Sequence, residues 1–320
     1  MSTATLVPET IGLDGERAIA TIRAARMRLL VKDSFSRLRW ADGFSHARAV
    51  AFQVVLTIIP GAIVLIAIAA ELHWDTLSKP IVQLARSLAP GPTGAVFNDA
   101  FDQGAKAGTS VSGWQAIGVG GAAFLISGTT AFGQIERAAN RIYGVEADRP
   151  ALRKYGLATA MMLSSGILAI LGFATLGLGQ EWAENAQYSL DDAWEVGRWP
   201  LSVVLLTLAF ALIFKISPRR RQPELSWLAV GGLLGVAGVL IVSLLFHFYL
   251  RVSSGFGDTY GPLAGILGVM MWAYLSCIVI FFGVAFAAQL EAIRAGHGEP
   301  RDPDKVHHSD PASAPTDVRR

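Results

Sequence analysis

The chain has 320 residues, of which 52% are apolar and 16% charged, and its net charge at pH 7 is +2. A soluble domain carries about 25% charged residues. This composition, with a mean hydropathy of +0.43, therefore excludes an ordinary soluble protein and is typical of repeated membrane spans. The single cysteine, Cys277, excludes an intramolecular disulfide, and no zinc-type Cys/His spacing is present. We expect neither a metal nor a cofactor.

The N-terminal region is polar and basic. Residues 1–14 are predicted to be a flexible tail. Residues 15–40 mix apolar side chains with many arginines, which predicts an amphipathic helix, or a pair of helices, on the inner membrane surface. The alternative is a solvated basic helix packed on the bundle. The expected partners are membrane lipids with anionic headgroups at the cytoplasmic face; no nucleic acid is expected, and homo-oligomer formation is left open.

Six apolar ranges follow along the chain. The first, 49–70, contains no charged residue and is long enough to cross a hydrocarbon core of about 30 Å as a helix. In the connection between the first and second ranges, Pro90-Gly91-Pro92 separates two short segments, which are predicted to be helices outside the membrane. The predicted fold is an all-α, polytopic membrane bundle of residues 15–294, followed by a disordered cytoplasmic tail, 295–320. Its predicted spans are 49–70, 114–132, 157–179, 199–216, 225–250 and 262–289.

Lysine and arginine alternate between the two sides of these spans. With Lys215 counted in the fourth connection, the termini and the even-numbered connections hold 22 of the 27 basic residues. The odd-numbered connections hold the other 5, together with 10 acidic residues. Positively charged connections stay inside, so both termini are predicted to be cytoplasmic and the protein is predicted to be a multi-pass protein of the bacterial inner (plasma) membrane.

Two polar helix faces are the candidate functional features. Each set of residues recurs at helical spacing and lies toward the inner half of the predicted bundle. They either line a polar cavity open to the cytoplasm or form interhelical hydrogen bonds of about 0.6 kcal/mol each. The candidates are Gln53, Thr57 and Pro60 on the first span, and Thr130, Gln134, Arg137 and Arg141 running out of the second.

No catalytic motif stands out. The six ranges contain neither Asp nor Glu, whereas proton-coupled pumps need titratable groups inside the membrane. The sequence has no phosphate-binding loop of the kind that ATP-hydrolysing proteins use. It also has no nucleophile elbow and no zinc-protease motif. We therefore expect a protein that is not an enzyme.

Three short motifs carry a resemblance to a known family. They are Arg48–Phe52 continuing to Thr57–Pro60, Glu136–Val145, and Thr259–Pro262 leading to Met271–Leu275. Together they resemble the YihY/virulence factor BrkB family of bacterial inner-membrane proteins, over roughly residues 29–294. One departure lies near the end of the sixth span. Many members have Gly-Ala-Glu there, whereas this chain has Gly-Val-Ala, with Ala285 in place of the glutamate. The family-motif residues are Glu136, Asn140, Tyr143, Gly144, Tyr260, Gly261, Pro262 and Trp272.

The resemblance implies an inner-membrane protein linked to envelope integrity. Members were once labelled ribonuclease BN, and a transporter of lipids or envelope precursors has been suggested. We therefore expect a non-ATP-driven transporter or a lipid- or envelope-precursor-handling protein. The alternatives are a membrane-associated ribonuclease and a structural envelope protein without transport.

Overall fold

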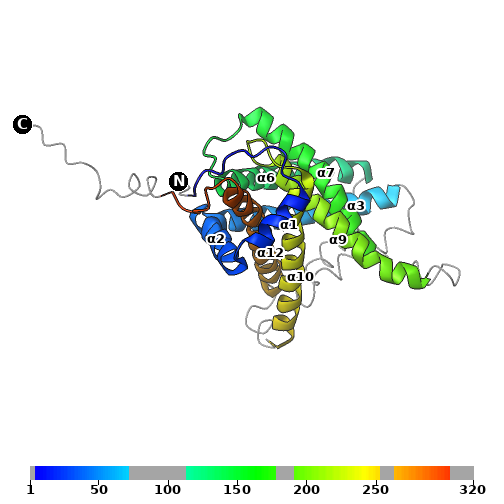
Figure 1. The fold of residues 1–320 in the computed structure, drawn as a ribbon. Helices are drawn as coiled ribbons and strands as arrows, with labels where there is room; N and C mark the ends of the chain where they lie inside the picture. The colour runs from blue at the N-terminus through cyan, green and yellow to red at the C-terminus, as the bar shows by residue number, and fades with distance from the viewer. Residues whose placement is uncertain (1–3, 72–112, 178–190, 253–262, 303–320) are drawn as a thin grey trace, which may run out of the picture.

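The computed structural model describes residues 4–71, 113–177, 191–252 and 263–302, and it is all-helical there apart from one isolated bridge between Ala4 and Arg301 (Figure 1). The all-α prediction is therefore confirmed. The Tyr260, Gly261 and Pro262 motif and the predicted helices of the first connection lie outside the described residues. The helices are α1 (Gly15–Ala24), α2 (Met27–Trp40), α3 (Gly43–Glu71), α6 (Gly113–Ile142), α7 (Ala151–Gly177), α9 (Asp191–Ile216), α10 (Leu225–Val252) and α12 (Leu263–Arg294).

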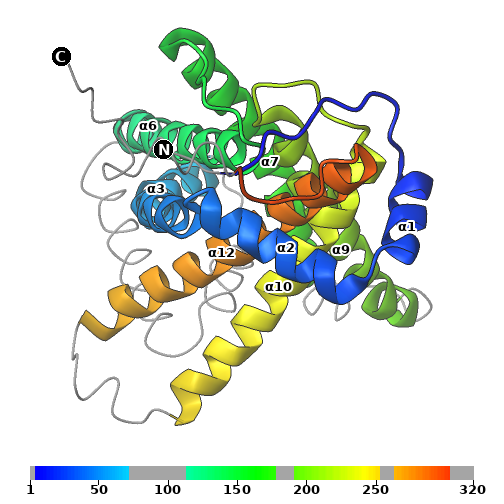
Figure 2. The ribbon, with the colours of Figure 1, turned by 60° about the vertical axis from the view of Figure 1, so that its left-hand side comes forward.

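The six long helices form a closed ring. Each packs mainly on its neighbours in the chain, in the order α3, α6, α7, α9, α10 and α12, and α12 returns to pack on α3 (Figure 2). Alternate helices run in opposite directions, so α3, α7 and α10 begin at the end of the ring where α6, α9 and α12 finish. We call this the polar end, because charged residues cluster there.

Four of the ring helices are long and apolar enough to cross a membrane: α7, α9, α10 and α12. The apolar windows are 151–172, 196–216, 225–249 and 265–294. They overlap four of the predicted ranges, although the first begins six residues before the predicted 157–179 and ends seven residues before it does. Helices α3 and α6 contain the other two predicted ranges and have 29 and 30 residues. The six-span count and the side on which the termini lie stay predictions.

Glycine allows α10 and α12 to lie in direct backbone contact. A Cβ atom on Gly231 of α10 would lie 2.5 Å from the carbonyl oxygen of Gly283 on α12, and the reverse clash is equally close. Small residues of this kind let helices approach in lipid, where association depends on packing rather than on the hydrophobic effect.

The predicted N-terminal amphipathic segment is a pair of helices, α1 and α2. The Asp14 side chain caps α1 by accepting a hydrogen bond of 2.9 Å from the Arg17 N–H. Helix α2 crosses α12 (Figure 2) and buries Leu30 and Leu38 against the bundle.

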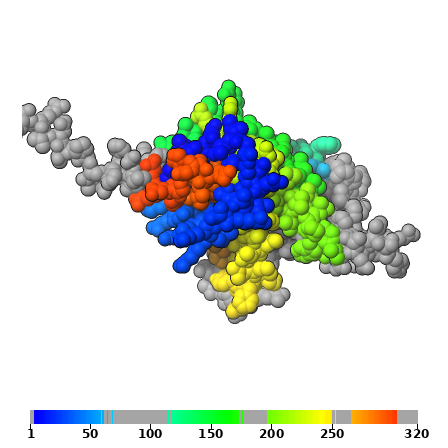
Figure 3. Space-filling model, viewed as in Figure 1, coloured from blue at the N-terminus to red at the C-terminus, as the bar shows by residue number. Residues whose placement is uncertain are grey.

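Parts of the two segments expected to be loose make tertiary contacts, while residues 303–320 of the expected C-terminal tail lie outside the described residues. Val7 N–H donates to the Tyr143 carbonyl at 3.1 Å, and Thr5 N–H donates to the Pro300 carbonyl at 3.3 Å. Ala4, Val7 and Leu13 are buried. Residues 4–14 and 295–302 therefore cover the polar end side by side (Figure 3). Composition suggested tails because neither segment has an apolar period; tertiary hydrogen bonds order them instead.

Candidate functional site

The polar end contains two clusters of buried charge, each centred on a glutamate. Glu136 of α6 and Glu291 of α12 are both fully buried, with no side-chain area exposed to solvent. A buried carboxylate is costly unless it is paired. Both have an arginine partner, and each arginine comes from a connection between ring helices.

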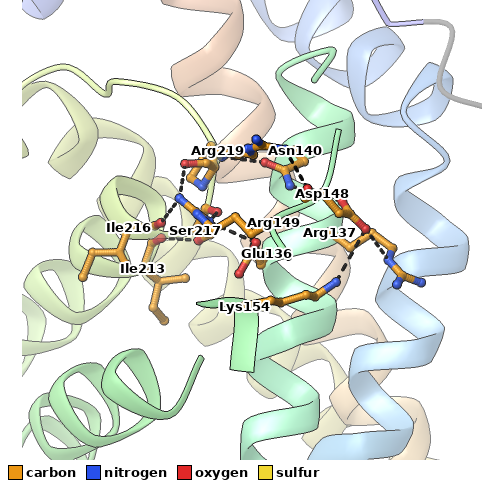
Figure 4. Close-up of polar contacts among 11 residues, drawn as sticks. Glu136, Arg137, Asn140, Asp148, Arg149, Lys154, Ile213, Ile216, Ser217 and Arg219 are labelled. Carbon is orange, nitrogen blue, oxygen red and sulfur yellow. Dashed lines mark hydrogen bonds and ion pairs between the residues drawn. The ribbon is translucent and has the colours of Figure 1, made fainter. Parts of the chain in front are cut away.

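In the Glu136 cluster, Arg149 connects two sides of the ring. Its Nη1 lies 3.0 Å from Glu136 Oε1. The same guanidinium donates to the carbonyls of Ser217 at 2.7 Å and Pro218 at 2.9 Å, just beyond the end of α9 (Figure 4). The last carbonyls of a helix lack partners within the helix, so Arg149 caps α9 while neutralising a carboxylate on α6.

Asp148 forms the outer part of this cluster (Figure 4). It accepts from Arg137 Nε at 3.3 Å and Asn140 Nδ2 at 3.4 Å, and Lys154 Nζ lies 3.6 Å away. Burial alone would raise the pKa of Asp148. The Lys154 charge, the Asn140 hydrogen bond and the nearby arginines outweigh it, so the pKa lies below the ordinary 3.8. Asn140 Oδ1 also accepts from Arg219 N–H at 2.6 Å.

In the Glu291 cluster, Arg220 forms a bidentate ion pair with the carboxylate. Arg220 Nη2 lies 2.7 Å from Oε1, and Nη1 lies 2.9 Å from Oε2. Its guanidinium lies over the Tyr143 ring, 4.7 Å from the ring centre, and donates to the Pro8 carbonyl at 3.0 Å. Paired charge-assisted bonds of this kind are the strongest that side chains make. They join α12, the α9–α10 connection, the end of α6 and the N-terminal segment.

Arg37 of α2 lies beside this cluster, and its hydrogen bonds among the described residues go to an amide and to two carbonyls rather than to a carboxylate. Its Nε donates to Gln289 Oε1 at 2.8 Å, and its Nη1 donates to the carbonyls of Thr5 at 2.9 Å and Ile142 at 3.3 Å. Desolvation by burial lowers the pKa of Arg37 to about 10. The guanidinium therefore stays charged at neutral pH. Burial also raises the pKa of the neighbouring Tyr143 hydroxyl.

The first predicted polar face lies on α3. Gln53, Thr57 and Pro60 are each half-buried there. The Thr57 hydroxyl donates to the Gln53 carbonyl at 2.7 Å, which satisfies it within its own helix. The cavity that these residues were proposed to line stays a prediction.

The second predicted face divides along α6. The Thr130 hydroxyl donates to the Ile126 carbonyl at 2.7 Å, again within the helix, and Gln134 is half-buried. Arg137 belongs to the Glu136 cluster, and Arg141 Nη1 donates to the Glu146 carbonyl at 3.0 Å. Only the part of the face nearest the polar end therefore joins the charged clusters.

The family-motif residues of α6 are drawn together by the fold. Glu136, Asn140 and Tyr143 all belong to the two clusters. Gly144 has φ +75°, and a Cβ atom there would lie 2.7 Å from the Leu6 backbone, so glycine is required where the N-terminal segment crosses. Trp272 of α12 donates from Nε1 to Ser243 Oγ of α10 at 3.0 Å.

Sequence reasoning missed eight residues of these clusters. Ala285 is buried, and the acidic residue of α12 is Glu291, two residues beyond the predicted span. A signal existed, because isolated charges directly after an apolar run are candidates for burial at a helix end. The missed residues are Arg37, Asp148, Arg149, Lys154, Arg219, Arg220, Gln289 and Glu291.

Among the residues that the structure describes, no three His, Cys, Asp or Glu side chains lie together in a way that could hold a metal ion.

A comparison with protein families matches residues 34–308 to the model described as virulence factor BrkB. The ribonuclease-like protein YfkH of Bacillus subtilis is 26% identical over 260 residues, which cover 79% of this chain and 92% of that protein. A UPF0761 membrane protein of Xanthomonas campestris is 24% identical over 82% of this chain, and one of Bordetella petrii is 25% identical over 79%. The chain spans 61% and 55% of the length of these two relatives. No solved structure matches.

Proposed function

The chain belongs to the virulence factor BrkB family and is a multi-pass protein of the bacterial inner (plasma) membrane, and on this premise we propose that it is a transporter that works without hydrolysing ATP. Its cargo would be a lipid or an amphiphilic envelope precursor. The membrane character of the relatives supports a role at the membrane, and the architecture supports movement through the bundle.

The closed ring is the observation that carries this proposal. Each long helix packs mainly on its two neighbours rather than around a central helix. A path for cargo along the ring axis therefore needs only the helices to separate slightly. At the polar end, the Glu136 and Glu291 clusters join helices on different sides of the ring.

The bonds across the polar end are of a kind that can open and close. Arg149 and Arg220 both lie on connections rather than on ring helices, and each reaches a carboxylate on a helix. Interfaces built from such discrete ion pairs switch between two packed arrangements rather than deforming continuously. In the present arrangement the polar end is closed, and opening it would require both arginines to leave their partners.

The cargo is expected to carry negative charge. Arginine is the residue best suited to bind phosphate, because its planar fork donates two parallel hydrogen bonds. When the clusters open, Arg149, Arg220 and Arg37 would be released around the polar end together. An anionic headgroup with an apolar tail would satisfy them and leave its tail in the bilayer.

The alternatives are a ribonuclease and a structural protein. The Bacillus subtilis relative is named ribonuclease-like, and the basic polar end would suit RNA. A structural role requires no transport at all. The three differ in what the purified protein does alone.

Purified protein in liposomes separates the three. We expect fluorescent anionic phospholipids to exchange between leaflets, or an envelope precursor to cross, faster than in empty liposomes. The double variant Glu136→Gln/Glu291→Gln should change that rate, whereas Gly118→Ala, on an open face of α6, should not. Metal-dependent RNA cleavage that persists through stringent purification would favour the ribonuclease. Inactivity in both the lipid-transfer and the RNA-cleavage assay would favour the structural role.

A further inference from the structure

Helix α2 presents an exposed apolar stripe to the outside of the bundle. Met27, Val31 and Phe35 recur every four residues and are 50%, 43% and 50% exposed. Leu30 and Leu38 lie on the adjoining face of the helix and are buried, and α2 packs on α12. An apolar stripe at this spacing on an outward face is unusual for a helix that meets only water.

A basic stripe runs beside the apolar one. Arg28, Lys32 and Arg39 are exposed, and helical geometry places them about 80° around α2 from the apolar stripe. The two stripes together form an apolar edge bordered by positive charge. This is the pattern of a helix that lies in the boundary between headgroups and acyl chains.

The apolar stripe is continuous with the lipid side of the first predicted span. The Phe35 ring meets the Phe44 ring of α3 edge-on, with 5.9 Å between ring centres. Farther along α3, Phe52 and Leu56 are 50% and 44% exposed. These two residues lie inside the predicted span 49–70, and in that span outward apolar side chains would face acyl chains. The stripe therefore extends that surface past the end of the span.

From this continuity and the single sign of the charges, we propose that α2 is a docking surface for anionic phospholipids of the leaflet at the polar end. Met27, Val31 and Phe35 insert among the acyl chains, and Arg28, Lys32 and Arg39 bind the phosphates. A second copy of the chain would bring the same basic stripe against itself, which like-charge repulsion opposes. The surface is independent of the proposed transport and requires only that the protein is in a membrane.

The position of α2 can be measured by spin labels in the full chain. In a Cys277→Ala background, nitroxides are placed at Val31→Cys and Phe35→Cys in nanodiscs of phosphatidylcholine and phosphatidylglycerol. Phe52→Cys is the reference within lipid, and Glu299→Cys, in the exposed C-terminal segment, is the reference in water. We expect oxygen to enhance the spin relaxation of the nitroxides at positions 31 and 35 more than an aqueous nickel chelate does. The same preference is expected for the reference at position 52.

Two results would overturn the insertion. Nickel access at positions 31 and 35 equal to that at position 299 would mean that the stripe faces water. Protection from both reagents would mean that protein, such as a second copy, covers it.

The preference for anionic lipid is tested by neutralising charge. Arg28→Gln/Lys32→Gln should lower the enrichment of spin-labelled phosphatidylglycerol over phosphatidylcholine around the protein, by about fivefold for each charge at a site with full contact. Arg221→Gln/Arg294→Gln removes two exposed charges elsewhere at the polar end and should have a smaller effect. Equal losses in the two pairs, or no loss in either, would contradict a headgroup site on α2.

Discussion

At the residue scale, the polar end depends on arginines whose partners are distant in sequence. Arg220 and Glu291 are 71 positions apart, yet both are almost fully buried and bonded through two oxygens. Taking both charges out of water is expensive, and their attraction roughly balances that cost. The pair therefore specifies how α12 meets the α9–α10 connection more than it adds net stability.

Removing one member of this pair should be more damaging than removing both. Glu291→Leu leaves Arg220 buried without its carboxylate and should cost about 3–5 kcal/mol. Arg220→Met/Glu291→Leu should cost clearly less. Unfolding in mixed detergent micelles measures both, and Arg137→Gln, which breaks the exposed pair with Asp148, should cost about 1 kcal/mol or less. A double variant as unstable as the single one would contradict this account.

Asp148 should make the stability of the polar end depend on pH. Its pKa is lowered from 3.8 by folding, so its contribution is present above that pH and is lost as the pH falls through the lower folded value. Asp148→Asn should lower the free energy of unfolding at pH 7, by less than about 1 kcal/mol because the carboxylate is partly exposed. The difference from wild type should vanish in strong acid.

The control for this experiment is Glu16→Gln, which removes one exposed carboxylate from α1. If the Asp148→Asn difference persisted unchanged in strong acid, its cause would be packing rather than charge.

At the element scale, helix contacts in the ring depend on which glycines face a neighbour. Gly231 and Gly283 meet across α10 and α12, whereas a Cβ atom on Gly118 of α6 would touch nothing within 4 Å. The sequence shows many glycines in the apolar ranges but not which of them are contacts. Only the crossing of two helices distinguishes a packing glycine from an exposed one.

Substitution of these glycines by alanine should separate the two kinds. Gly283→Ala places a methyl group against the backbone of α10 and should destabilise the fold by about 1–3 kcal/mol. Gly118→Ala should be neutral or slightly stabilising, because alanine favours helix. Thermal unfolding in detergent compares them directly. Equal stability of the two variants would show that α10 and α12 are not in backbone contact.

At the scale of the whole molecule, the ring and the charge distribution imply a direction in the membrane. Both clusters lie at one end, together with the N-terminal helices α1 and α2 and the residues 295–302. This is the end that the excess of lysine and arginine predicts to be cytoplasmic. The predicted orientation therefore places every charged cluster described above on the inner side.

Reporter fusions test this orientation. Fusions after Arg153 and after Arg221 should report the cytoplasm, and fusions at Asp99 and Asp192 should report the outside. Two reporters provide the matched control at each position: alkaline phosphatase, which is active outside the cytoplasm, and a fluorescent protein, which is fluorescent inside it. A cytoplasmic signal at Asp192 would refute the six-span topology.

The sequence by itself determined the helical class, the order of the apolar ranges and the membrane location. Each of these depends on the residues of one segment and on their cost of transfer into lipid. The windows of α7, α9, α10 and α12 accordingly overlap four predicted ranges. The motif Glu136–Val145 also signalled the family, although it did not show what its glutamate would contact.

Only the tertiary structure decided the closure of the ring, the partners of the buried charges and the packing of the chain ends. Arg37, for example, lies in a basic segment like its neighbours, and nothing local indicates that it alone is buried beside Gln289. Residues 4–14 are ordered by bonds to Tyr143 and Pro300. These contacts join positions far apart in the chain, so their energies are properties of the assembled bundle and not of any one segment.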